Sequence, residues 1–590
     1  MTVEKLITDH IDIWSSALQT RSAAGRGSNG KIDLYGIKKL RELILELAVR
    51  GKLVPQDPND EPASELLKRI AAEKAELVKQ GKIKKQKPLP EISEGEKPFE
   101  LPVGWEWARL GNTVAIIRGI TFPASEKHKE PSEGKVACLR TANIQDSIEW
   151  DDLLYVSKSF VKRSEQFAEK GDIVMSMANS RELVGKVAYI YNIPTGSATF
   201  GGFLSVIRPY GFNAGFLMSV LRSPNIKSIL IDSSSQTTNI ANISLEKLNP
   251  LVILVPPVKE QNRIASKVEE LMSLCDQLEQ QSLLSLDAHQ QLVETLLATL
   301  TDSQDTKELS DNWARISQYF GTLFTTEASI DALKQTILQL AVMGKLVPQD
   351  PNDEPAFELL KRIEQEKAEL VKQGKIKKQK PLPPVSDEEK PFELPVGWGW
   401  VRLGDIGTIS GGGTPSKNNE EYWLGDIPWL SPKDMKVDYI STAEFNISEL
   451  AVANSSVRII PNNSILFVVR GMILAHTFPV AINKKEVTIN QDMKSITSHL
   501  FNMDFLLNLM KGMSRNVLSL VDRSSHGTCK LVSEKLFNLQ IPLPPLSEQS
   551  RINNRIEELV SLCDTLKSRL QSAQQTQLHL ADALTDAALN

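Results

Sequence analysis

The segment GKLVPQDPNDEP stands at Gly51–Pro62 and again, letter for letter, at Gly344–Pro355. The same displacement of 293 residues holds for EKAELVKQGKIKKQKPLP, which begins at Glu73 and at Glu366, and for EKPFELPVGW, which begins at Glu96 and at Glu389. Self-similarity at a fixed spacing is the sign of a repeated structural plan. The chain is therefore expected to consist of two copies of one architecture.

The likeness between the two copies stops and then resumes. Residues 106–250 and 399–540 share little, but LVPPVKEQNRIASKVEELMSLCDQL at 254–278 is matched by PLPPLSEQSRINNRIEELVSLCDTL at 542–566. Near-identical segments thus enclose a different region twice, with abrupt borders. A duplication that drifted everywhere would blur those borders, so a fixed frame presenting two independently chosen modules is the favoured interpretation.

The repeated segments have helical periodicity. After Glu260, apolar residues recur at steps of four and three, which is a heptad seam; its members are Ile264, Val268, Leu271, Cys275 and Leu278. The second copy repeats the seam from Ile552 to Leu570. Cys275 and Cys563 occupy seam positions and are interpreted as small core residues. In the first copy Ser282, Ser285 and His289 interrupt the pattern.

A shorter helix is predicted before each different region, at Ile37–Leu47 and at Ile330–Leu340. Gly51 and Gly344 follow as stops, and Pro-Pro pairs at 256–257 and 544–545 mark the starts of the long helices. Each of these helices has one apolar stripe, which must be buried against another element. In the simplest arrangement, the long helix of one half packs against the short helix of the other half, which gives the chain pseudo-twofold symmetry. A long helix of about 40 residues would form a spacer about 60 Å long.

The two different regions are predicted to be rich in β-structure. Strands are expected at 171–177, 184–190, 464–469 and 480–489, and short helices at 213–222 and 504–513. The fold class is therefore α+β: two β-rich domains separated by paired, antiparallel long helices that form a coiled-coil spacer. The expected divisions of the chain are an N-terminal segment (1–32), a helical region with a basic arm (33–104), a variable domain (105–255), a central spacer with a second arm (256–397), a second variable domain (398–543) and a C-terminal helix (544–590).

Bulk properties describe an ordinary globular protein of 590 residues with 24% charged residues and net charge −5. The negative charge lies outside the variable domains: residues 105–255 hold 16 basic and 14 acidic residues, and residues 398–543 hold 14 and 13. The four cysteines are far apart, with no zinc or disulfide spacing. Neither a signal peptide nor an apolar run long enough for a bilayer is visible. A cytoplasmic protein is predicted.

The sequence contains no motif that indicates an enzyme. Gly25–Ile32 approaches a phosphate-binding loop, but Ile32 occupies the hydroxyl position and no strand precedes it. No H-E-x-x-H, G-x-S-x-G or adenine-methyltransferase tetrad occurs, and Asn249-Pro250 is followed by Leu251. The seven histidines form no metal spacing. We therefore expect no catalytic residues, no metal and no cofactor bound by this chain.

The chain resembles the specificity subunits of type I restriction–modification systems. The resemblance rests on WLSPKDM (Trp429–Met435), on the preceding GGTPSKNNEEYWLGDIP (412–428), and on the exit motif PLPPLSEQSRI (542–552), which recurs as VPPVKEQNRI. The long basic repeated arm is similar to that of the IB branch. The first variable domain has no GDIPWL segment, only ACLRTANIQ (137–145) in a comparable place.

This resemblance implies a non-catalytic subunit of a host-defence enzyme, with one target-recognition domain per half of a bipartite, asymmetric site in double-stranded DNA. The helices would set the gap and dock two methyltransferase subunits, which carry S-adenosylmethionine. Nuclease–translocase subunits would add ATP- and Mg-dependent cleavage. Two alternatives remain: a structural scaffold whose inserts bind proteins, and a stand-alone enzyme in the variable domains.

Candidate DNA-contacting residues follow from the hydrogen bonds that side chains make with bases, Arg with guanine, Asn or Gln with adenine, and Ser or Thr with either. In the first variable domain they are Arg118, Arg140, Asn143, Gln145, Arg181, Gln236 and Asn239. In the second they are Thr414, Ser416, Lys417, Ser431, Lys433, Arg470, Arg523, Ser524, Ser525 and His526. About a third of them are expected to touch bases, because most such hydrogen bonds go to phosphate and sugar.

The basic arms supply candidate phosphate contacts, Lys84, Lys85, Lys377 and Lys378, although a solvated basic loop explains these lysines equally well. Trp105 and Trp398 are interpreted as core anchors at the start of each variable domain, not as platforms for stacked bases.

Overall fold

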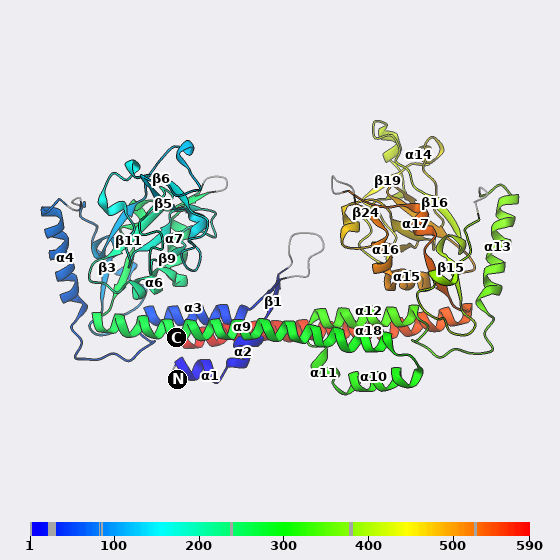
Figure 1. Ribbon diagram of the computed structural model, residues 1–590, viewed down its shortest axis with the longest axis horizontal. Coiled ribbons are helices and arrows are strands. Elements are labelled where there is room, and N and C mark those ends of the chain that lie inside the picture. The colour runs from blue at the N-terminus through cyan, green and yellow to red at the C-terminus, as the bar shows by residue number, and fades with distance from the viewer. Residues whose placement is uncertain are drawn as a thin grey trace. The chain divides into compact units, whose positions relative to one another are not determined.

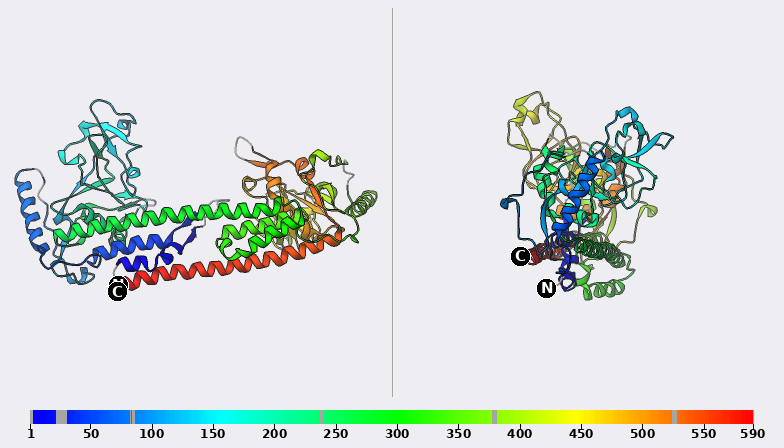
Figure 2. Two further views of the ribbon diagram at one scale, coloured as in Figure 1. Left: turned by 60° about the horizontal axis from the view of Figure 1, so that its bottom comes forward. Right: turned by 90° about the vertical axis from the view of Figure 1, so that its left-hand side faces the viewer.

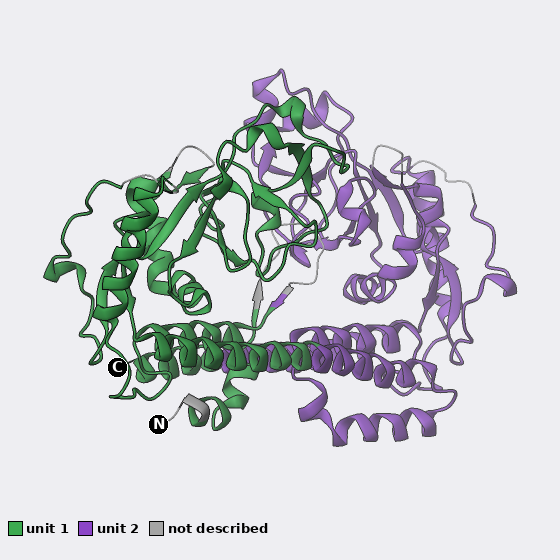
Figure 3. Cartoon of the chain, turned by 60° about the vertical axis from the view of Figure 1, so that its left-hand side comes forward, with its two compact units in different colours: residues 1–19, 33–283, 576–590 green, residues 20–32, 284–575 purple. Residues whose placement is uncertain are grey.

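The computed structural model describes residues 3–21, 31–81, 83, 86–236, 240–376, 381–523 and 528–589. Two compact units divide the chain: unit 1 comprises residues 1–19, 33–283 and 576–590, and unit 2 comprises 20–32 and 284–575 (Figure 3). Each unit holds one variable domain and one group of packed helices. None of the helices in the described ranges combines the length and apolar character of a membrane span.

The helices outside the variable domains account for the repeated sequence. In unit 1 they are α1 (Val3–Thr8), α2 (Ile11–Ser16), α3 (Tyr35–Val49) and α4 (Ala63–Lys79). In unit 2 they are α10 (Thr306–Gln318), α11 (Phe320–Leu323), α12 (Glu327–Val342) and α13 (Ala356–Lys372). Two strands, β1 (Gln19–Arg21) and β2 (Lys31–Asp33), pair near the division between the units.

Two long helices begin in one unit and end in the other, running in opposite directions. They are α9 (Val258–Asp302), of 45 residues, and α18 (Leu546–Leu589), of 44 residues. Figure 2 shows each as one uninterrupted helix. The serines that break the heptad seam of α9 therefore do not break the helix. They mark a change of partner, since the division between the units falls after Leu283.

In unit 1, α3 packs against the beginning of α9 and against the end of α18. Arg41 forms ion pairs of 2.6 Å with both Asp276 and Glu279 of α9. On the other side, the Tyr35 hydroxyl donates to Asp582 of α18 at 2.7 Å. The seam residue Cys275 is 1% exposed, which confirms its interpretation as a small core residue.

In unit 2, α12 repeats this arrangement with the roles of the long helices exchanged. Lys567, midway along α18 and in the part of it that belongs to unit 2, pairs with Asp331 at 2.9 Å. The end of α9 supplies carbonyl acceptors, with Lys345 donating to Thr301 at 2.7 Å. The predicted pairing of each long helix with the short helix of the other half is thus confirmed, but it is incomplete, because each long helix also packs against the short helix of its own half. Cys563 is 4% exposed.

The helix boundaries follow the stop and start signals. Gly51 and Gly344 have φ of +66° and +68°, values that favour glycine. A Cβ at Gly344 would lie 2.5 Å from Pro395. Both long helices start directly after a Pro-Pro pair, as predicted.

The first variable domain contains two small sheets side by side and short helices (Figure 1). The order of strands is β4-β11-β7-β9 in one sheet and β10-β5-β6 in the other, with short sheets β12-β13-β8 and β14-β3. Its strands are β3 (Glu106–Arg109), β4 (Val114–Arg118), β5 (Lys135–Leu139), β6 (Leu154–Ser157), β7 (Ile173–Ser176), β8 (Ala178–Asn179), β9 (Val187–Tyr189), β10 (Ala198–Phe200), β11 (Leu204–Pro209), β12 (Ser235–Gln236), β13 (Ala241–Asn242) and β14 (Val252–Val255). Its helices are α5 (Leu110–Thr113), α6 (Ala214–Arg222), α7 (Pro224–Ser233) and α8 (Leu245–Leu248).

The second variable domain repeats this topology although its sequence does not match. Its sheets have the orders β16-β23-β20-β21-β18 and β19-β17-β22, with β15-β26 and β24-β25 as short pairs. Its strands are β15 (Gly399–Arg402), β16 (Thr408–Gly411), β17 (Ile427–Leu430), β18 (Tyr439–Ile440), β19 (Phe445–Ile447), β20 (Ile465–Val468), β21 (Val480–Asn483), β22 (Thr488–Ile489), β23 (Met493–Thr497), β24 (Val521–Arg523), β25 (Cys529–Leu531) and β26 (Gln540–Leu543). Its helices are α14 (Glu449–Ala453), α15 (Met503–Gly512), α16 (Ser514–Ser519) and α17 (Ser533–Phe537).

The two domains share most of their strand pairings, although β18 adds a fifth strand to the larger sheet of the second domain and β24-β25 has no third strand like β8. In each, a short strand pairs in parallel with one partner, β10 with β5 and β22 with β17, and the following strand crosses to the other sheet. That following strand pairs antiparallel with two neighbours in both cases, β11 with β4 and β7, and β23 with β16 and β20. The α+β class with two β-rich domains is therefore confirmed.

Most of the predicted elements of the variable domains exist, with shorter bounds. The segment 171–177 contains β7, 184–190 contains β9 and 464–469 contains β20. The predicted single strand at 480–489 is wrong, since β21 ends at Asn483 and β22 begins at Thr488 in a different sheet. The buried Asn483 side chain explains the break: its amide donates to the carbonyls of Pro461 and Lys485, both at 2.7 Å, which turns the chain.

Candidate nucleic-acid interface

In the first variable domain, loops from four strands meet around the turn at Gly201–Phe203, between β10 and β11. The Gly201 amide donates to the Leu139 carbonyl at 2.9 Å, which places the start of the loop after β5 here. Ile120, two residues after Arg118, forms a bridge with Gly201. The Met177 amide donates to the Phe203 carbonyl at 2.9 Å. We call this set, with the paired strands β8, β12 and β13, the first loop cluster.

Phe203 is presented outward from this turn. Its side chain is 69% exposed, although phenylalanine is usually buried. The preceding glycines allow the close approach of neighbouring backbone, since a Cβ on Gly202 would lie 3.3 Å from the Ile120 carbonyl oxygen. Sequence inspection did not single out Phe203, because a lone phenylalanine after two glycines carries no motif.

The predicted contact residues of this domain differ in availability. Arg118 is exposed at the end of β4, and Arg181 is exposed and lies 3.7 Å from Asp232. Arg140 already pairs with Asp152 at 2.6 Å. Gln145 accepts from Lys186 at 2.9 Å.

Asn143 stabilises its own loop. It is 2% exposed, its side-chain oxygen accepts from the Arg140 amide at 2.8 Å, and its side-chain nitrogen donates to the Glu149 carbonyl at 3.1 Å. A side chain whose polar atoms are already paired has no free edge to offer a base. Of the remaining predictions, Asn239 lies outside the described residues, as does the side chain of Gln236 on β12.

The second variable domain has a corresponding cluster around the turn at Asn490–Asp492, between β22 and β23. The Asn490 amide donates to the Leu430 carbonyl at 2.9 Å, beside Ser431, and the Thr414 hydroxyl donates to Gln491. Asp492 faces Arg470 at 3.6 Å. We call these loops, together with β24 and β25, the second loop cluster.

Four of the predicted residues of this domain gather in or beside that cluster. Arg470 is exposed and bridges Lys530 of β25, and Arg523, also exposed, pairs with Cys529 of the same strand. Thr414 and Ser431 are part of the cluster but already use their hydroxyls, Ser431 donating to Asp434 at 2.8 Å.

The other predicted residues lie farther along the loops or outside the structure. Ser416, Lys417 and Lys433 are exposed on the loops that lead away from the cluster. Ser524, Ser525 and His526 lie outside the described residues, as do Lys84, Lys85, Lys377 and Lys378. Lys530 and Gln491 are members of the cluster that the sequence did not indicate, since only strand pairing brings them there.

Both domains join their long helix through the same hydrogen bonds. The Trp105 indole donates to Glu260 of α9 at 3.0 Å, and the Trp398 indole donates to Glu548 of α18 at 2.9 Å. We call these two arrangements, with their neighbours, the junctions. Trp105 is 5% exposed, which confirms its interpretation as a core anchor.

A buried arginine beside each junction binds the segment of chain that follows the basic arm. Arg109 donates to the Pro90 carbonyl at 3.1 Å, and Arg402 donates to the equivalent Pro383 carbonyl at 3.0 Å. Arg109 also binds Glu96 through two nitrogens, at 2.6 and 3.0 Å. This pairing, with hydrogen bonds from Ser93, lowers the pKa of Glu96 to about 2.

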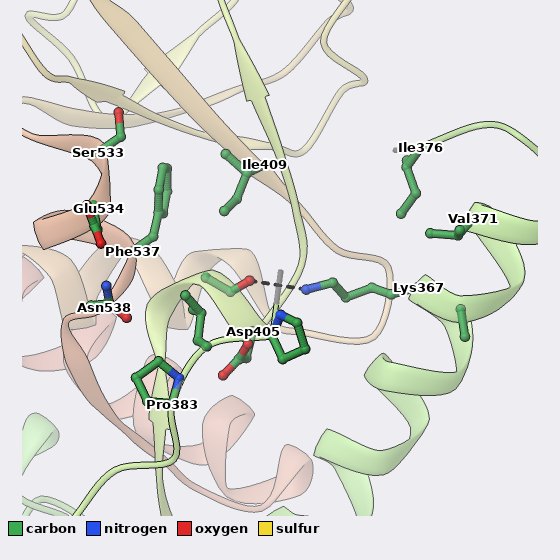
Figure 4. A pocket seen from close by; sticks show the side chains of 14 residues that line it. Lys367, Val371, Ile376, Pro383, Asp405, Ile409, Ser533, Glu534, Phe537 and Asn538 are labelled. Atoms are coloured by element: carbon green, nitrogen blue, oxygen red, sulfur yellow. Dashed lines mark hydrogen bonds between the residues drawn. The ribbon is translucent and has the colours of Figure 1, made fainter. Parts of the chain in front are cut away.

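A half-buried lysine ties each arm helix to the domain. Lys74 of α4 donates to the Gly111 carbonyl, and burial lowers its pKa to about 8. Lys367 of α13 donates to Gly404 at 3.1 Å, and burial lowers its pKa as well. Figure 4 shows Lys367 reaching from α13 across a pocket of about 490 Å³. Val371, Ile409 and Phe537 line this pocket, which makes it largely apolar.

No cluster of three or more His, Cys, Asp or Glu residues that could hold a metal ion occurs among the described residues. The exposed arginines of the loop clusters are suited to binding phosphate and base edges.

Comparison with known proteins gives the class. A family model described as the type I restriction modification DNA specificity domain matches residues 102–288 and 395–575, once per variable domain. The chain belongs to the type I restriction–modification specificity subunits, which are non-catalytic and bring no cofactor of their own.

Individual relatives span the whole chain. The specificity subunit of the type I restriction enzyme EcoEI from Escherichia coli is 51% identical over 611 residues, and that of EcoAI from Escherichia coli is 49% identical over 614, each covering 100% of both chains. The crystal structure of the HsdS subunit from Thermoanaerobacter tengcongensis overlaps 84% of this chain and 98% of its own, with 18% identity and a TM-score of 0.40.

Proposed function

We propose that the two variable domains each read one half of a bipartite, asymmetric site in double-stranded DNA. The observation that carries the proposal is the pair of loop clusters, which share one topology and one kind of junction but differ in their exposed side chains. Two domains with equal frames and different loops suit two different base sequences. The contact residues proposed first are Arg118, Arg181, Arg470 and Arg523, because they are exposed at the clusters.

Phosphate contacts would come from the basic arms, whose lysines follow α4 and α13. Double-stranded DNA carries one negative charge per about 1.7 Å of axis, so cations dominate affinity. The variable domains themselves are close to neutral. We therefore propose that the arms, including Lys84, Lys85, Lys377 and Lys378, and the partner subunits supply much of the binding energy.

The long helices would dock two methyltransferase subunits that carry S-adenosylmethionine and methylate adenine. Nuclease–translocase subunits that use ATP and Mg would complete the restriction enzyme. The domain limits proposed are 105–255 and 398–543, with the helices and arms outside them and 1–32 as an N-terminal segment. The basic arms favour the IB branch of the family. Because its substrate would be genomic DNA, we place the assembly in the cytoplasm.

The test is co-expression with the candidate methyltransferase subunits, followed by mapping of N6-methyladenine in genomic DNA. A bipartite motif with a fixed gap is expected. Replacing residues 106–250 by the corresponding region of a relative should change one half of the motif and leave the other. An assembled, cofactor-bound complex without methylation would overturn the proposal and favour a scaffold whose inserts bind proteins.

A further inference from the structure

The junctions repeat the same contacts in the two halves of the structure. In each, an indole at the start of the variable domain binds a glutamate in the first turn of a long helix. Both glutamates are 1% exposed. A charge-assisted hydrogen bond that is shielded from water is strong and directional. This bond therefore restrains rotation of the variable domain about the end of its helix.

A second bond acts beside the first in both units. Gln261 accepts from the Asn213 amide at 2.8 Å and donates to the Pro256 carbonyl at 2.9 Å. Gln549 accepts from the Asn502 amide at 3.1 Å and donates to Pro544 at 3.1 Å. These asparagines are the N-caps of α6 and α15. The beginning of each long helix is therefore also hydrogen-bonded to a second element of the domain.

A third contact ties the loop before each arm helix to the next turn of the long helix. Arg263 binds Asp60 at 2.7 Å, and Arg551 binds Asp353 at 2.6 Å. In unit 2, Gln349 of the same loop donates to Glu548 at 3.2 Å. The glutamate thus lies where three parts of the chain meet: the residue just before the first strand of the domain, the long helix and the loop.

The orientation held by these contacts matters for a bipartite site. Successive base pairs are about 3.4 Å apart along one strand. A rotation at the junction that moves the loop cluster by this distance would bring the domain onto the next base pair. β24, a strand of the second loop cluster, lies away from the end of α18 at which its domain is attached (Figure 1), so a small rotation suffices.

We propose that Glu260 and Glu548 are positioning residues that, by holding Trp105 and Trp398, fix the direction of each variable domain on its helix and so the number of base pairs between the two half-sites. The inference rests on the proposed function. According to this inference, the number of base pairs between the half-sites depends on the junctions as well as on the length of the helices.

The experiment measures methylation by the assembled complex on three DNAs that carry the same two half-sites separated by the native gap or by one base pair more or less. The variants are Trp105→Phe, which removes the donor and keeps the ring, Glu260→Leu, which removes the acceptor, and Glu260→Gln, which retains an acceptor oxygen. Trp107→Phe is the matched control, because Trp107 lies two residues farther along the chain, in β3, and its ring packs against Phe99.

Trp105→Phe and Glu260→Leu should each raise methylation of the altered gaps, relative to the native gap, by about tenfold, as expected for losing one buried hydrogen bond. Glu260→Gln and Trp107→Phe should keep the wild-type ratio. A general loss of stability would lower methylation of all three DNAs together. An unchanged ratio in Trp105→Phe would therefore overturn the inference and leave the proposed function standing. A wild-type complex with no bipartite motif would overturn both.

Discussion

The loop clusters of the two variable domains differ in almost every exposed residue, whereas the junctions at their helices repeat the same bonds. By strand pairing, the turn Gly201–Phe203 in the first cluster corresponds to the turn Asn490–Asp492 in the second. The first turn presents an aromatic side chain, whereas the second presents amide and carboxylate side chains. At the junctions, Trp–Glu bonds of 3.0 and 2.9 Å recur. The comparison teaches that the surface for specificity changes freely while the attachment does not.

The largest expected effect tests whether the two attachments are equivalent. Arg109→Ala removes a buried side chain that donates to the Pro90, Glu91 and Pro250 carbonyls and to Glu96. We expect a loss of about 3 kcal/mol in the free energy of unfolding, because several part-buried acceptors lose a charged donor at once. Urea unfolding of the full chain measures it.

The equivalent Arg402→Ala should cost the same within experimental error. The control is Arg69→Ala, which removes an exposed ion pair with Glu61 and should leave stability unchanged. A large loss in one half and none in the other would show that the two attachments are not equivalent.

The next effect sharpens the contrast between the clusters. Arg470→Ala should weaken recognition of one half-site by about 1–3 kcal/mol, or roughly 5- to 150-fold, if this guanidinium contacts a base. Methylation of DNAs mutated in either half-site measures the change. The half-site read by the first variable domain should be unaffected. Equal weakening on every sequence would instead indicate a phosphate contact.

A smaller effect concerns charge at the junction. Burial, with the nearby Asp60 charge, raises the pKa of Glu260, and the hydrogen bond from Trp105 opposes this shift only in part. Its protonated form therefore stabilises the fold at pH values below the ordinary glutamate pKa of about 4.3, and this contribution is lost as the pH rises through the raised pKa.

Relative to Glu260→Gln, the wild-type chain should thus lose stability as the pH increases from about 4 to 7. Thermal unfolding at several pH values measures this difference. Glu270→Gln, on the exposed side of the same helix, is the control. A wild-type advantage that grows with pH would contradict the expected direction.

The smallest effect compares the two helix seams. Cys275→Ala and Cys563→Ala each remove one buried sulfur, and each should cost about 1 kcal/mol. Similar values would support equal packing of α3 on α9 and α12 on α18. A clear difference between the two would locate a looser seam.

Much of this architecture was predictable because it rests on periodicity and on repetition. The heptad steps from Ile264 predicted α9, and the Pro-Pro pairs predicted where both long helices begin. Exact repeats predicted two equivalent halves. The strands at 171–177 and 464–469 were visible because each is a short apolar run after a turn residue.

The predicted contact residues stay predictions, but the structure shows how residue type differs from availability at particular positions. Asn143 was selected by residue type, but its amide is buried and holds a loop. Phe203 and Lys530 were not among the predicted contact residues. Strand pairing places them at the clusters, and no local sequence pattern indicates this. Residue type describes what a side chain can bond to, whereas exposure and partners depend on the packed domain.

The sequence by itself determined the two-copy plan, the long helices, the variable domains and the family, because helical periodicity, proline and glycine signals and repeated motifs are local properties of the chain. Only the tertiary structure decided that the two unmatched regions share one topology, that each long helix changes partner along its length, and that Trp105 bonds to Glu260 across 155 positions. Those features depend on contacts between segments far apart in the chain, and such contacts form only when the hydrophobic core closes and brings the segments together.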